Sequence, residues 1–237
     1  MSIKSLPDYP LLKKLAEALW RNETSYQGAA IMVGSGFSRS AASSGDINSK
    51  LPLWNDLLKV LSKDLESDPW GDPLRISEEY SSYFGKQALK DVIEQTVNDP
   101  AWIPGDLYGS LLKLPWTEVL TTNWDTLLER AASDIYKPIY SIVNKPEDLS
   151  SSRSPRIVKL HGTVQISHNL IFTQEDYRQY PKTHAAFVNL ARQVFIENEF
   201  YKGTIDFIDD EGNMYDFKYS NNIEGYLQSG QLHVYKY

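Results

Sequence analysis

The sequence contains no cysteine among its 237 residues. Disulfide bonds, thiolate nucleophiles and cysteine-ligated zinc or iron–sulfur sites are therefore excluded. Its apolar runs are far shorter than the roughly 20 residues that span a bilayer. Its first ten residues are polar and contain proline, unlike the start of a secretory signal peptide. We therefore expect a cytoplasmic protein with no membrane partner.

The chain also lacks an excess of basic charge. Its 24 lysines and arginines are outnumbered by 31 aspartates and glutamates, which gives a formal net charge of −7. A broad basic surface for nucleic acid is therefore not expected, although a local patch is compatible with this balance. The 41% hydrophobic and 23% charged residues are typical of a globular protein. The length suits one large domain, or one domain and a shorter segment.

Short apolar runs alternate with segments of helical periodicity between residues 29 and 200. Apolar runs with the length and β-branched residues of a buried strand occur at 29–33, 119–122, 139–143, 157–160 and 170–172. Helical spacing of apolar residues precedes the first run, at 11–20, and recurs at 53–65, 77–97, 106–113, 126–132 and 183–200. This order predicts an α/β fold with a Rossmann-like, mostly parallel sheet flanked by helices.

Three unusual turns follow three of the predicted strands. They are Gly34-Ser35-Gly36, Thr122-Asn123-Trp124-Asp125 and His161-Gly162. Ligand-binding groups gather at the carboxyl ends of strands in parallel sheets, so we expect these turns to converge. The glycines of the first turn would let backbone N–H groups approach a pyrophosphate, although many ordinary turns carry two glycines.

Each polar residue of these turns has an ordinary explanation beside a functional one. A lone histidine such as His161 is more often a surface or core residue, but its ordinary pKa suits a general base. Asn123 could close a local turn, or it could hold a water molecule or a ribose hydroxyl. Asp125 is most simply a helix cap.

In order and spacing, these segments resemble the sirtuin-like family of NAD-consuming proteins. The residues that carry the resemblance are Gly34-Ser35-Gly36-Phe37-Ser38, Thr122-Asn123-Trp124-Asp125 and Lys159-Leu160-His161-Gly162. The resemblance covers residues 25–200 and is greatest to the bacterial branch used in anti-phage defence. Residues 53–58, which follow the glycine turn, also resemble that branch.

The resemblance implies an NAD+ hydrolase that cleaves the bond between nicotinamide and ribose to give nicotinamide and ADP-ribose. His161 would be the general base, and Asn123 would position the attacking water or the ribose. Asp125 would lie near the nicotinamide. The other residues implied in NAD+ binding are Gly34, Ser35, Gly36, Phe37, Ser38 and Thr122.

Protein-deacetylating sirtuins carry a module with four zinc-binding cysteines. Because this chain has no cysteine, we expect no zinc and favour the hydrolase over a deacetylase. Bacterial relatives are usually silent until a partner domain or an oligomer responds to infection, which implies a partner protein or self-association. After Phe200 the family continues with a strand and a glycine-rich loop on the adenosine side, whereas this chain continues with Tyr201-Lys202-Gly203.

Residues 201–237 have a different pattern, in which polar and apolar residues alternate as in a β-hairpin followed by a helix. It contains Gly203-Thr204-Ile205-Asp206, Asp216-Phe217-Lys218 and Gln231-Leu232-His233-Val234-Tyr235. On these residues the segment resembles part of the RecB-type branch of the PD-(D/E)xK nucleases. The resemblance implies that Asp206 and Asp216 would hold Mg²⁺ and that Lys218 would assist the attacking water. The preceding core strand of that family is not evident, so we interpret the segment as a nuclease-like fragment.

We therefore predict two parts, a sirtuin-like NAD-binding domain at 1–200 and a nuclease-like fragment at 201–237. The leading hypothesis is an NAD+ hydrolase of anti-phage defence. One alternative is a Mg²⁺-dependent nuclease that acts on DNA through the C-terminal segment. The other is a sensor module that binds NAD or an ADP-ribose derivative without turnover.

Overall fold

The computed structural model describes residues 3–7, 9–20, 29–45, 49–68 and 71–197, and two short strands at 207–208 and 214–215. Its α-helices are Tyr9–Leu19 (α1), Ser35–Ser38 (α2), Trp54–Asp64 (α3), Pro73–Phe84 (α4), Lys86–Val97 (α5), Asp106–Leu112 (α6), Leu127–Ser133 (α7), Gln174–Thr183 (α8) and Ala185–Glu197 (α9). Short 3₁₀ helices are Ile3–Ser5 (η1), Asp99–Ala101 (η2), Pro146–Ser150 (η3) and Val164–Asn169 (η4). The strands are Ala30–Val33 (β1), Ala42–Ser43 (β2), Trp102–Ile103 (β3), Glu118–Thr121 (β4), Ser141–Val143 (β5), Arg156–Lys159 (β6), Phe207–Ile208 (β7) and Met214–Tyr215 (β8).

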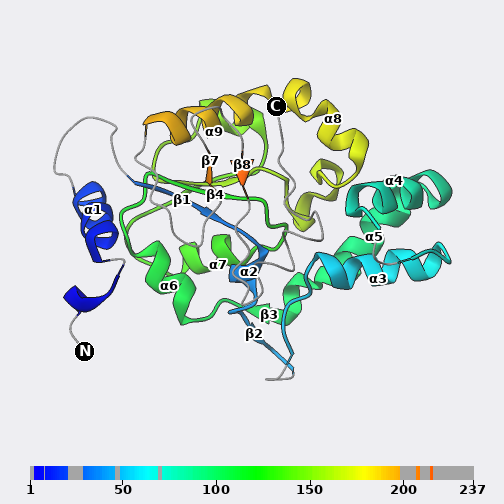
Figure 1. Cartoon of the computed structure of the whole chain (residues 1–237), viewed down its shortest axis with the longest axis horizontal. Helices are drawn as coiled ribbons and strands as arrows, with labels where there is room; N and C mark the ends of the chain where they lie inside the picture. Colours follow the sequence, from blue (N-terminus) through cyan, green and yellow to red (C-terminus); the bar gives the residue numbers. More distant parts are fainter. Residues whose placement is uncertain are drawn as a thin grey trace.

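A four-stranded sheet in the order β1-β4-β6-β5 forms the centre of the fold. All its neighbouring strands are parallel, as the alternation of strands and helices predicts. Figure 1 shows β1 and β4 crossing the molecule between α9 on one face and α6 and α7 on the other. The predicted α/β class with a mostly parallel, helix-flanked sheet is therefore confirmed.

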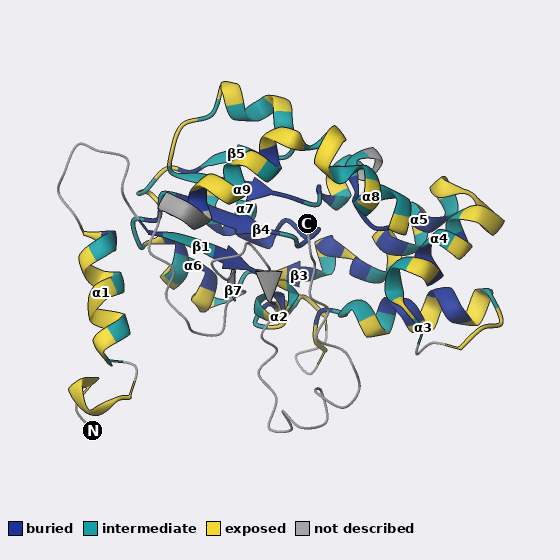
Figure 2. Ribbon diagram, turned by 45° about the horizontal axis from the view of Figure 1, so that its top comes forward, coloured by how far each residue is buried: buried dark blue, intermediate teal, exposed yellow. Residues whose placement is uncertain are grey.

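Alternate residues of the strands pack into two separate cores. Val33, Val119 and Ile157 face one core, which includes residues of α6 and α7. Met32, Leu120 and Val158 face the other, where Phe187 and Val194 of α9 cover them. In Figure 2 β4 is buried along its whole length, and β1 is buried toward its carboxyl end. Burial on both faces explains why the strands appear as uninterrupted apolar runs.

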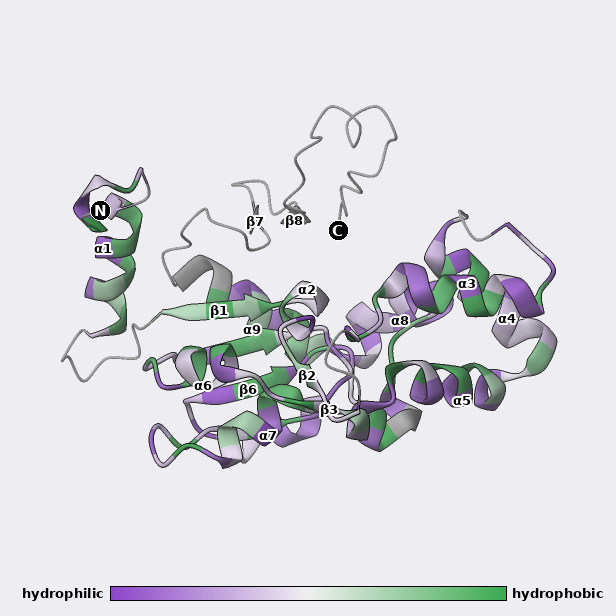
Figure 3. Cartoon of the chain, turned by 90° about the horizontal axis from the view of Figure 1, so that it is seen from below, coloured by the Kyte–Doolittle hydropathy of each residue, from purple (hydrophilic) through white to green (hydrophobic). Residues whose placement is uncertain are grey.

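Helices α3, α4 and α5 are inserted between β1 and β4 and form a module with its own core. Figure 3 shows this module beyond the end of the sheet toward which β1 points. Trp124 and Phe172, which come from the segments after β4 and before α8, also pack into that core. The module therefore faces the carboxyl edge of the sheet, where the three turns were expected.

Two predicted elements differ in the structure. The helix expected at 77–97 is two helices, because Gly85 between α4 and α5 has φ +90°, a conformation that ends a helix and suits glycine. The strand expected at 170–172 is a buried extended segment outside the sheet. Its backbone bonds instead to the His161 carbonyl and to the Asp176 carboxylate at the start of α8.

Helix α8 was not predicted, because 183–200 was the only helix expected in that region. The signal was present in the sequence. Thr173 and Asp176 form a reciprocal capping box at its N-terminus, which is a recognisable pattern at this spacing.

In the C-terminal segment, β7 and β8 pair antiparallel, as the predicted hairpin requires. Asp206, Asp216, Lys218 and the helix predicted after them lie outside the described residues. Within the described residues, no helix is both long and apolar enough to cross a membrane.

Candidate functional site

Ser35, Asn123 and His161 occupy equivalent positions at the carboxyl edge of the sheet. Val33 pairs with Thr121, and Thr121 pairs with Lys159, across three adjacent strands. Each of the three polar residues lies two positions beyond one of these paired residues. Neighbouring strands are about 4.8 Å apart, so this register places the three turns in one row. The sequence predicted this convergence, and the strand register now gives its physical basis.

Asn123 is buried and held at two of its atoms. Its backbone N–H donates to Thr121 Oγ1 at 3.0 Å, and that hydroxyl donates to the Val33 carbonyl at 2.7 Å. Its side-chain Nδ2 donates to Ser38 Oγ at 2.9 Å. Among the described residues no donor reaches Asn123 Oδ1. The amide is therefore oriented by its nitrogen, and its oxygen is left for another partner.

Ser38 and Asp125 complete this buried group. The Ser38 hydroxyl accepts from Asn123 and donates to Asp125 Oδ2 at 2.7 Å, and Ser38 has no exposed surface. The other carboxylate oxygen, Oδ1, accepts from the Leu127 backbone N–H at 3.2 Å, near the start of α7. Asp125 thus accepts from the first N–H of α7, whose N-cap residue is Thr126, and joins the start of that helix to α2 through Ser38.

The remaining residues of the glycine turn divide between solvent and core. Gly34 and Gly36 are exposed, and no atom lies within 4 Å of where a Cβ would stand on either of them. The Phe37 ring packs edge-on against Tyr108 of α6 at 4.8 Å, on the core side. Burial raises the pKa of the Tyr108 phenol, and the Asp125 charge acts in the same direction.

A pocket of about 60 Å³ opens between this edge of the sheet and the helical module. Its lining consists of Ser35, Leu51, Pro52, Leu53, Trp54, Leu57, Thr96, Val97, Thr122, Asn123, Trp124 and Asp125. The walls are largely apolar, and Trp54 and Trp124 meet there with their ring centroids 5.2 Å apart. The buried indole nitrogen of Trp124 has no hydrogen-bond partner in the described part of the chain. The pocket therefore offers flat apolar surfaces.

His161 lies in the same row but does not belong to the described lining of this pocket. Its imidazole meets the edges of Tyr177 and Tyr180 of α8, and its Nδ1 lies 3.4 Å from the Tyr177 hydroxyl. Burial, followed by the nearby His184, lowers the pKa of His161 to about 4. His161 is therefore a neutral imidazole at pH 7.

The backbone after His161 requires glycine. Gly162 has φ +80°, and a Cβ there would lie 2.4 Å from the Asn169 carbonyl oxygen. The neighbouring His161 carbonyl accepts from the Ile171 N–H at 3.1 Å. The turn that carries His161 is thus fixed by close backbone contact with the segment before α8.

The burial and the partners of two polar groups beneath the site were not predicted from the sequence. Lys159, at the end of β6, has no exposed surface and pairs with Glu129 of α7 at 3.1 Å. Burial raises the pKa of Glu129, while the charge of Lys159 lowers it. Lys159 belongs to the third motif, but nothing in the sequence shows which groups a strand lysine will meet.

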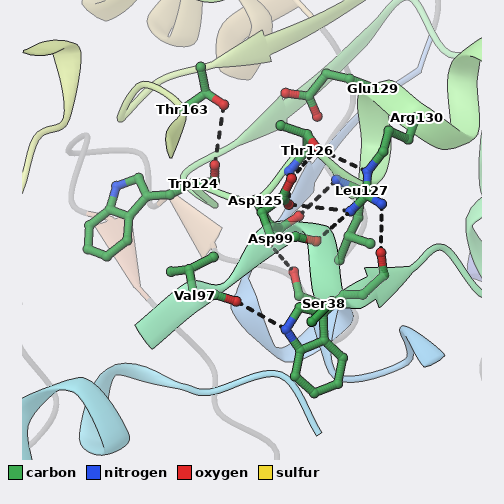
Figure 4. Close-up of polar contacts among 12 residues, drawn as sticks. Ser38, Val97, Asp99, Trp124, Asp125, Thr126, Leu127, Glu129, Arg130 and Thr163 are labelled. Atoms are coloured by element: carbon green, nitrogen blue, oxygen red, sulfur yellow. Dashed lines mark hydrogen bonds and ion pairs between the residues drawn. The ribbon is translucent and has the colours of Figure 1, made fainter. Parts of the chain in front are cut away.

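The second group centres on Asp99 of η2. Its carboxylate accepts from the Thr126 N–H at 2.7 Å and from the Thr126 hydroxyl at 2.6 Å. Arg130 donates to the Asp99 and Trp102 carbonyls, and Figure 4 shows these contacts around the start of α7. This network joins the end of the helical module to the segment that follows Asn123.

The predicted metal ligands Asp206 and Asp216 cannot be placed, since they lie outside the described residues. Among the residues that the structure does describe, no group of three or more histidine, aspartate or glutamate side chains has the arrangement of a metal site.

Comparison with known proteins gives a match to one protein family and matches to individual relatives. The family described as "SIR2-like domain" matches residues 117–203, which include Asn123, Asp125 and His161. The chain is 26% identical over 183 residues to "NAD(+) hydrolase ThsA" of Cytobacillus dafuensis, covering 75% of this chain and 34% of that protein. It is 29% identical over 164 residues to "NAD(+) hydrolase ThsA" of Acinetobacter baumannii, covering 67% of this chain and 32% of that protein.

A third relative is "Defense-associated sirtuin 2" of Bacillus subtilis, which is 23% identical over 158 residues. That match covers 62% of this chain and 15% of the relative. The chain therefore spans about a third of the length of the two hydrolases, and less of the third protein. The chain is therefore similar to sirtuin-like proteins, and the match to the SIR2-like domain covers the strands β4 and β6 with the turns that follow them.

Proposed function

We propose that the chain is an NAD+ hydrolase that releases nicotinamide and ADP-ribose and acts in anti-phage defence. The observation that carries the proposal is the row of Ser35, Asn123 and His161 beside a pocket at the carboxyl edge of a parallel sheet. The names of the two hydrolase relatives support the same activity.

His161 is proposed as the general base. A base must be unprotonated to accept a proton, and the lowered pKa of His161 keeps it so at pH 7. Water attacks the ribose carbon as the bond to nicotinamide breaks, the bond electrons neutralise the pyridinium nitrogen, and the water proton passes to the imidazole. Asn123 Oδ1, which no described donor reaches, would hold that water or a ribose hydroxyl.

The glycine turn is proposed to face the diphosphate. Gly34 and Gly36 leave open the space that side chains would fill, and no neighbouring protein atom requires glycine at either position. Backbone N–H groups next to glycine can approach phosphate oxygens closely. The buried hydroxyl of Ser38 is already engaged by Asn123 and Asp125, so we assign it the orientation of Asn123 rather than a phosphate contact.

The pocket is small compared with the ~300–1,000 Å³ of typical ligand pockets. We therefore infer that only one ring of the dinucleotide enters it, with the rest of the molecule along the exposed glycine turn. Trp54 and Trp124, whose rings are in contact with each other, would form one apolar wall beside that ring, and Asp125 would lie near it.

The test is to incubate the purified chain with NAD+, with and without Mg²⁺, and to quantify nicotinamide and ADP-ribose by chromatography. His161→Ala and Asn123→Ala should each lower the rate by about a hundredfold or more. Asn189→Ala, an exposed position on α9, and His233→Ala in the C-terminal segment are the matched controls and should retain the rate.

Three outcomes would overturn parts of the proposal. Binding of NAD+ that leaves it intact would identify the sensor module. If the controls lost activity as well as the site variants, the results would contradict the roles proposed for Asn123 and His161. Release of an acetyl group from acetyl-lysine peptides at the expense of NAD+ would favour the deacetylase.

We further propose that residues 1–200 form the NAD-binding domain and that 201–237 is a nuclease-like fragment. The antiparallel pair β7–β8 supports a hairpin there. If the fragment is active, DNA cleavage should require Mg²⁺, stop with a chelator, and be lost in Asp216→Asn while NAD+ cleavage is retained. Cytoplasmic location and control by a partner protein or self-association are also part of this proposal, and NAD+ cleavage measured across protein concentrations tests self-association.

A further inference from the structure

Lys159 is a lysine with no exposed surface at the last position of β6. Its neighbours along the strand, Ile157 and Val158, are equally buried and apolar. An ammonium group in such surroundings is costly unless it is paired and hydrogen-bonded. The partners of Lys159 therefore indicate what its charge does.

Both partners of Lys159 belong to the segment that follows β4. Its Nζ donates to the main-chain carbonyl of Asp125 and lies 3.1 Å from Glu129 Oε1. Asp125 ends the turn that carries Asn123, and Glu129 lies in the first turn of α7. A single side chain of β6 thus binds the turn after β4 and the helix into which that turn leads.

The position of Lys159 along its own strand shows which two segments these contacts connect. His161 lies two residues after Lys159, and Asn123 lies two residues before Asp125. Lys159 therefore joins the two segments that carry the proposed base and the proposed positioning amide. The strand pairing itself stops at Thr121 and Lys159, and the Leu160 N–H then donates to the Thr121 carbonyl. Farther from the strands, the Val164 N–H and the Thr163 hydroxyl donate to the Trp124 carbonyl, so Lys159 acts beside two hydrogen bonds that hold the far end of the same turn.

Stability alone does not explain a charged residue here. Buried ion pairs can often be replaced by apolar side chains of similar volume without loss of stability, whereas the removal of one partner is strongly destabilising. A paired ammonium has one property that a methionine lacks, which is a directed hydrogen bond to a particular carbonyl.

We propose that Lys159 is a positioning residue that fixes the Asn123 turn relative to His161 for NAD+ cleavage. This inference rests on the proposed function for its kinetic consequence, while the positioning itself is a property of the folded chain. Lys159 has no exposed surface with which to contact a substrate, so it would act through the Asp125 carbonyl.

The kinetic test compares Lys159→Met with the double variant Lys159→Met/Glu129→Gln. The single variant leaves Glu129 buried without its partner, while the double variant removes both charges and keeps the shape. Displacement of a catalytic group by about 1 Å can cost about a hundredfold in rate. We expect kcat to fall by about that factor in both variants, with a smaller change in KM, while the thermal midpoint recovers in the double variant.

Lys113→Met, at an exposed lysine that ends α6, is the matched control and should leave kcat unchanged. Recovery of kcat together with the thermal midpoint in the double variant would overturn the proposal, because the role of Lys159 would then be structural only.

A second readout does not depend on turnover. The chain has six tryptophans, and Trp124 lies within the turn that Lys159 holds. Its indole N–H resonance can be assigned by its loss in Trp124→Phe. Positioning predicts that this resonance shifts or broadens in the folded double variant, while the resonance of Trp116, on the approach to β4, does not. If wild-type protein failed to cleave NAD+, the proposed function would fall and this readout alone would decide the positioning, with an unchanged Trp124 resonance overturning it.

Discussion

At the scale of single residues, the surroundings of His161 lead to a prediction about pH. The imidazole is packed against Tyr177 and Tyr180, and burial followed by the charge of His184 lowers its pKa to about 4. The rate of NAD+ cleavage should therefore stay constant as the pH falls from 7.5 to 5. An unperturbed histidine base would lose half of its activity near pH 6.5.

The measurement is kcat/KM for NAD+ over this range, with His184→Ala beside the wild type. Removal of His184 takes away the second cause of the shift, so any acid limb should move toward higher pH. A wild-type midpoint near 6.5 would contradict the prediction. The same lowered pKa makes the unfolded chain bind more protons below about pH 6.5, so stability is present above that value and is lost as the pH falls toward 4.

The sequence indicated site residues only where they stood directly after a predicted strand. Asn123 and His161 follow apolar runs directly, so their place at the sheet edge could be predicted from the fold class. Lys159 and Asp99 could not be recognised in this way. Their partners, Glu129 and Thr126, lie 30 and 27 residues away in the chain and meet them only through packing.

At the scale of elements, the start of α7 depends on a cap supplied by another element. Asp99 of η2 accepts two hydrogen bonds from Thr126 and is surrounded by donors of Arg130. Asp99→Ala should lower the free energy of unfolding by about 3–5 kcal/mol, because it leaves a partly buried guanidinium and two buried donors without their acceptor.

The exposed cap of α4 provides the comparison. Within the part of the chain that the structure describes, Asp72 accepts from the Leu74 N–H alone, at 2.9 Å, so Asp72→Ala should cost about 1 kcal/mol. Chemical denaturation of both variants measures the difference. Equal losses would mean that the Asp99 network contributes no more than an ordinary surface cap.

The same scale shows why some elements were predicted and others were not. The four paired strands were found because burial on both faces gives apolar runs that need no partner to be recognised. The segment 170–172 has the same composition, but its N–H groups bond to His161 and Asp176 instead of a neighbouring strand. Apolar content alone does not distinguish a strand paired in the sheet from an extended segment outside it. The glycine at position 85, by contrast, could have indicated the break between α4 and α5.

At the scale of the whole molecule, the described sheet, helical module and candidate site all lie within residues 29–197. A chain ending at Glu197 should therefore retain NAD+ cleavage within about threefold of the full chain. A larger decrease would mean a loss of more than about 0.7 kcal/mol of transition-state stabilisation, which would require a contact from the later segment. Steady-state kinetics of the truncated and full chains, with circular dichroism as the folding control, tests this. Loss of NAD+ binding in the folded truncated chain would show that residues after 197 complete the nucleotide site.

The order of the strands also determines when this site can exist. Val33 and Thr121 are hydrogen-bonded neighbours separated by 88 positions, and β6 joins them only after a further crossover. Because such long-range pairings form late in folding, the row from Ser35 to His161 cannot assemble on a partly synthesised chain. During translation the nascent polypeptide would carry the glycine turn and the helical module long before the proposed NAD+ cleavage could begin. That activity would require most of the domain to have left the ribosome.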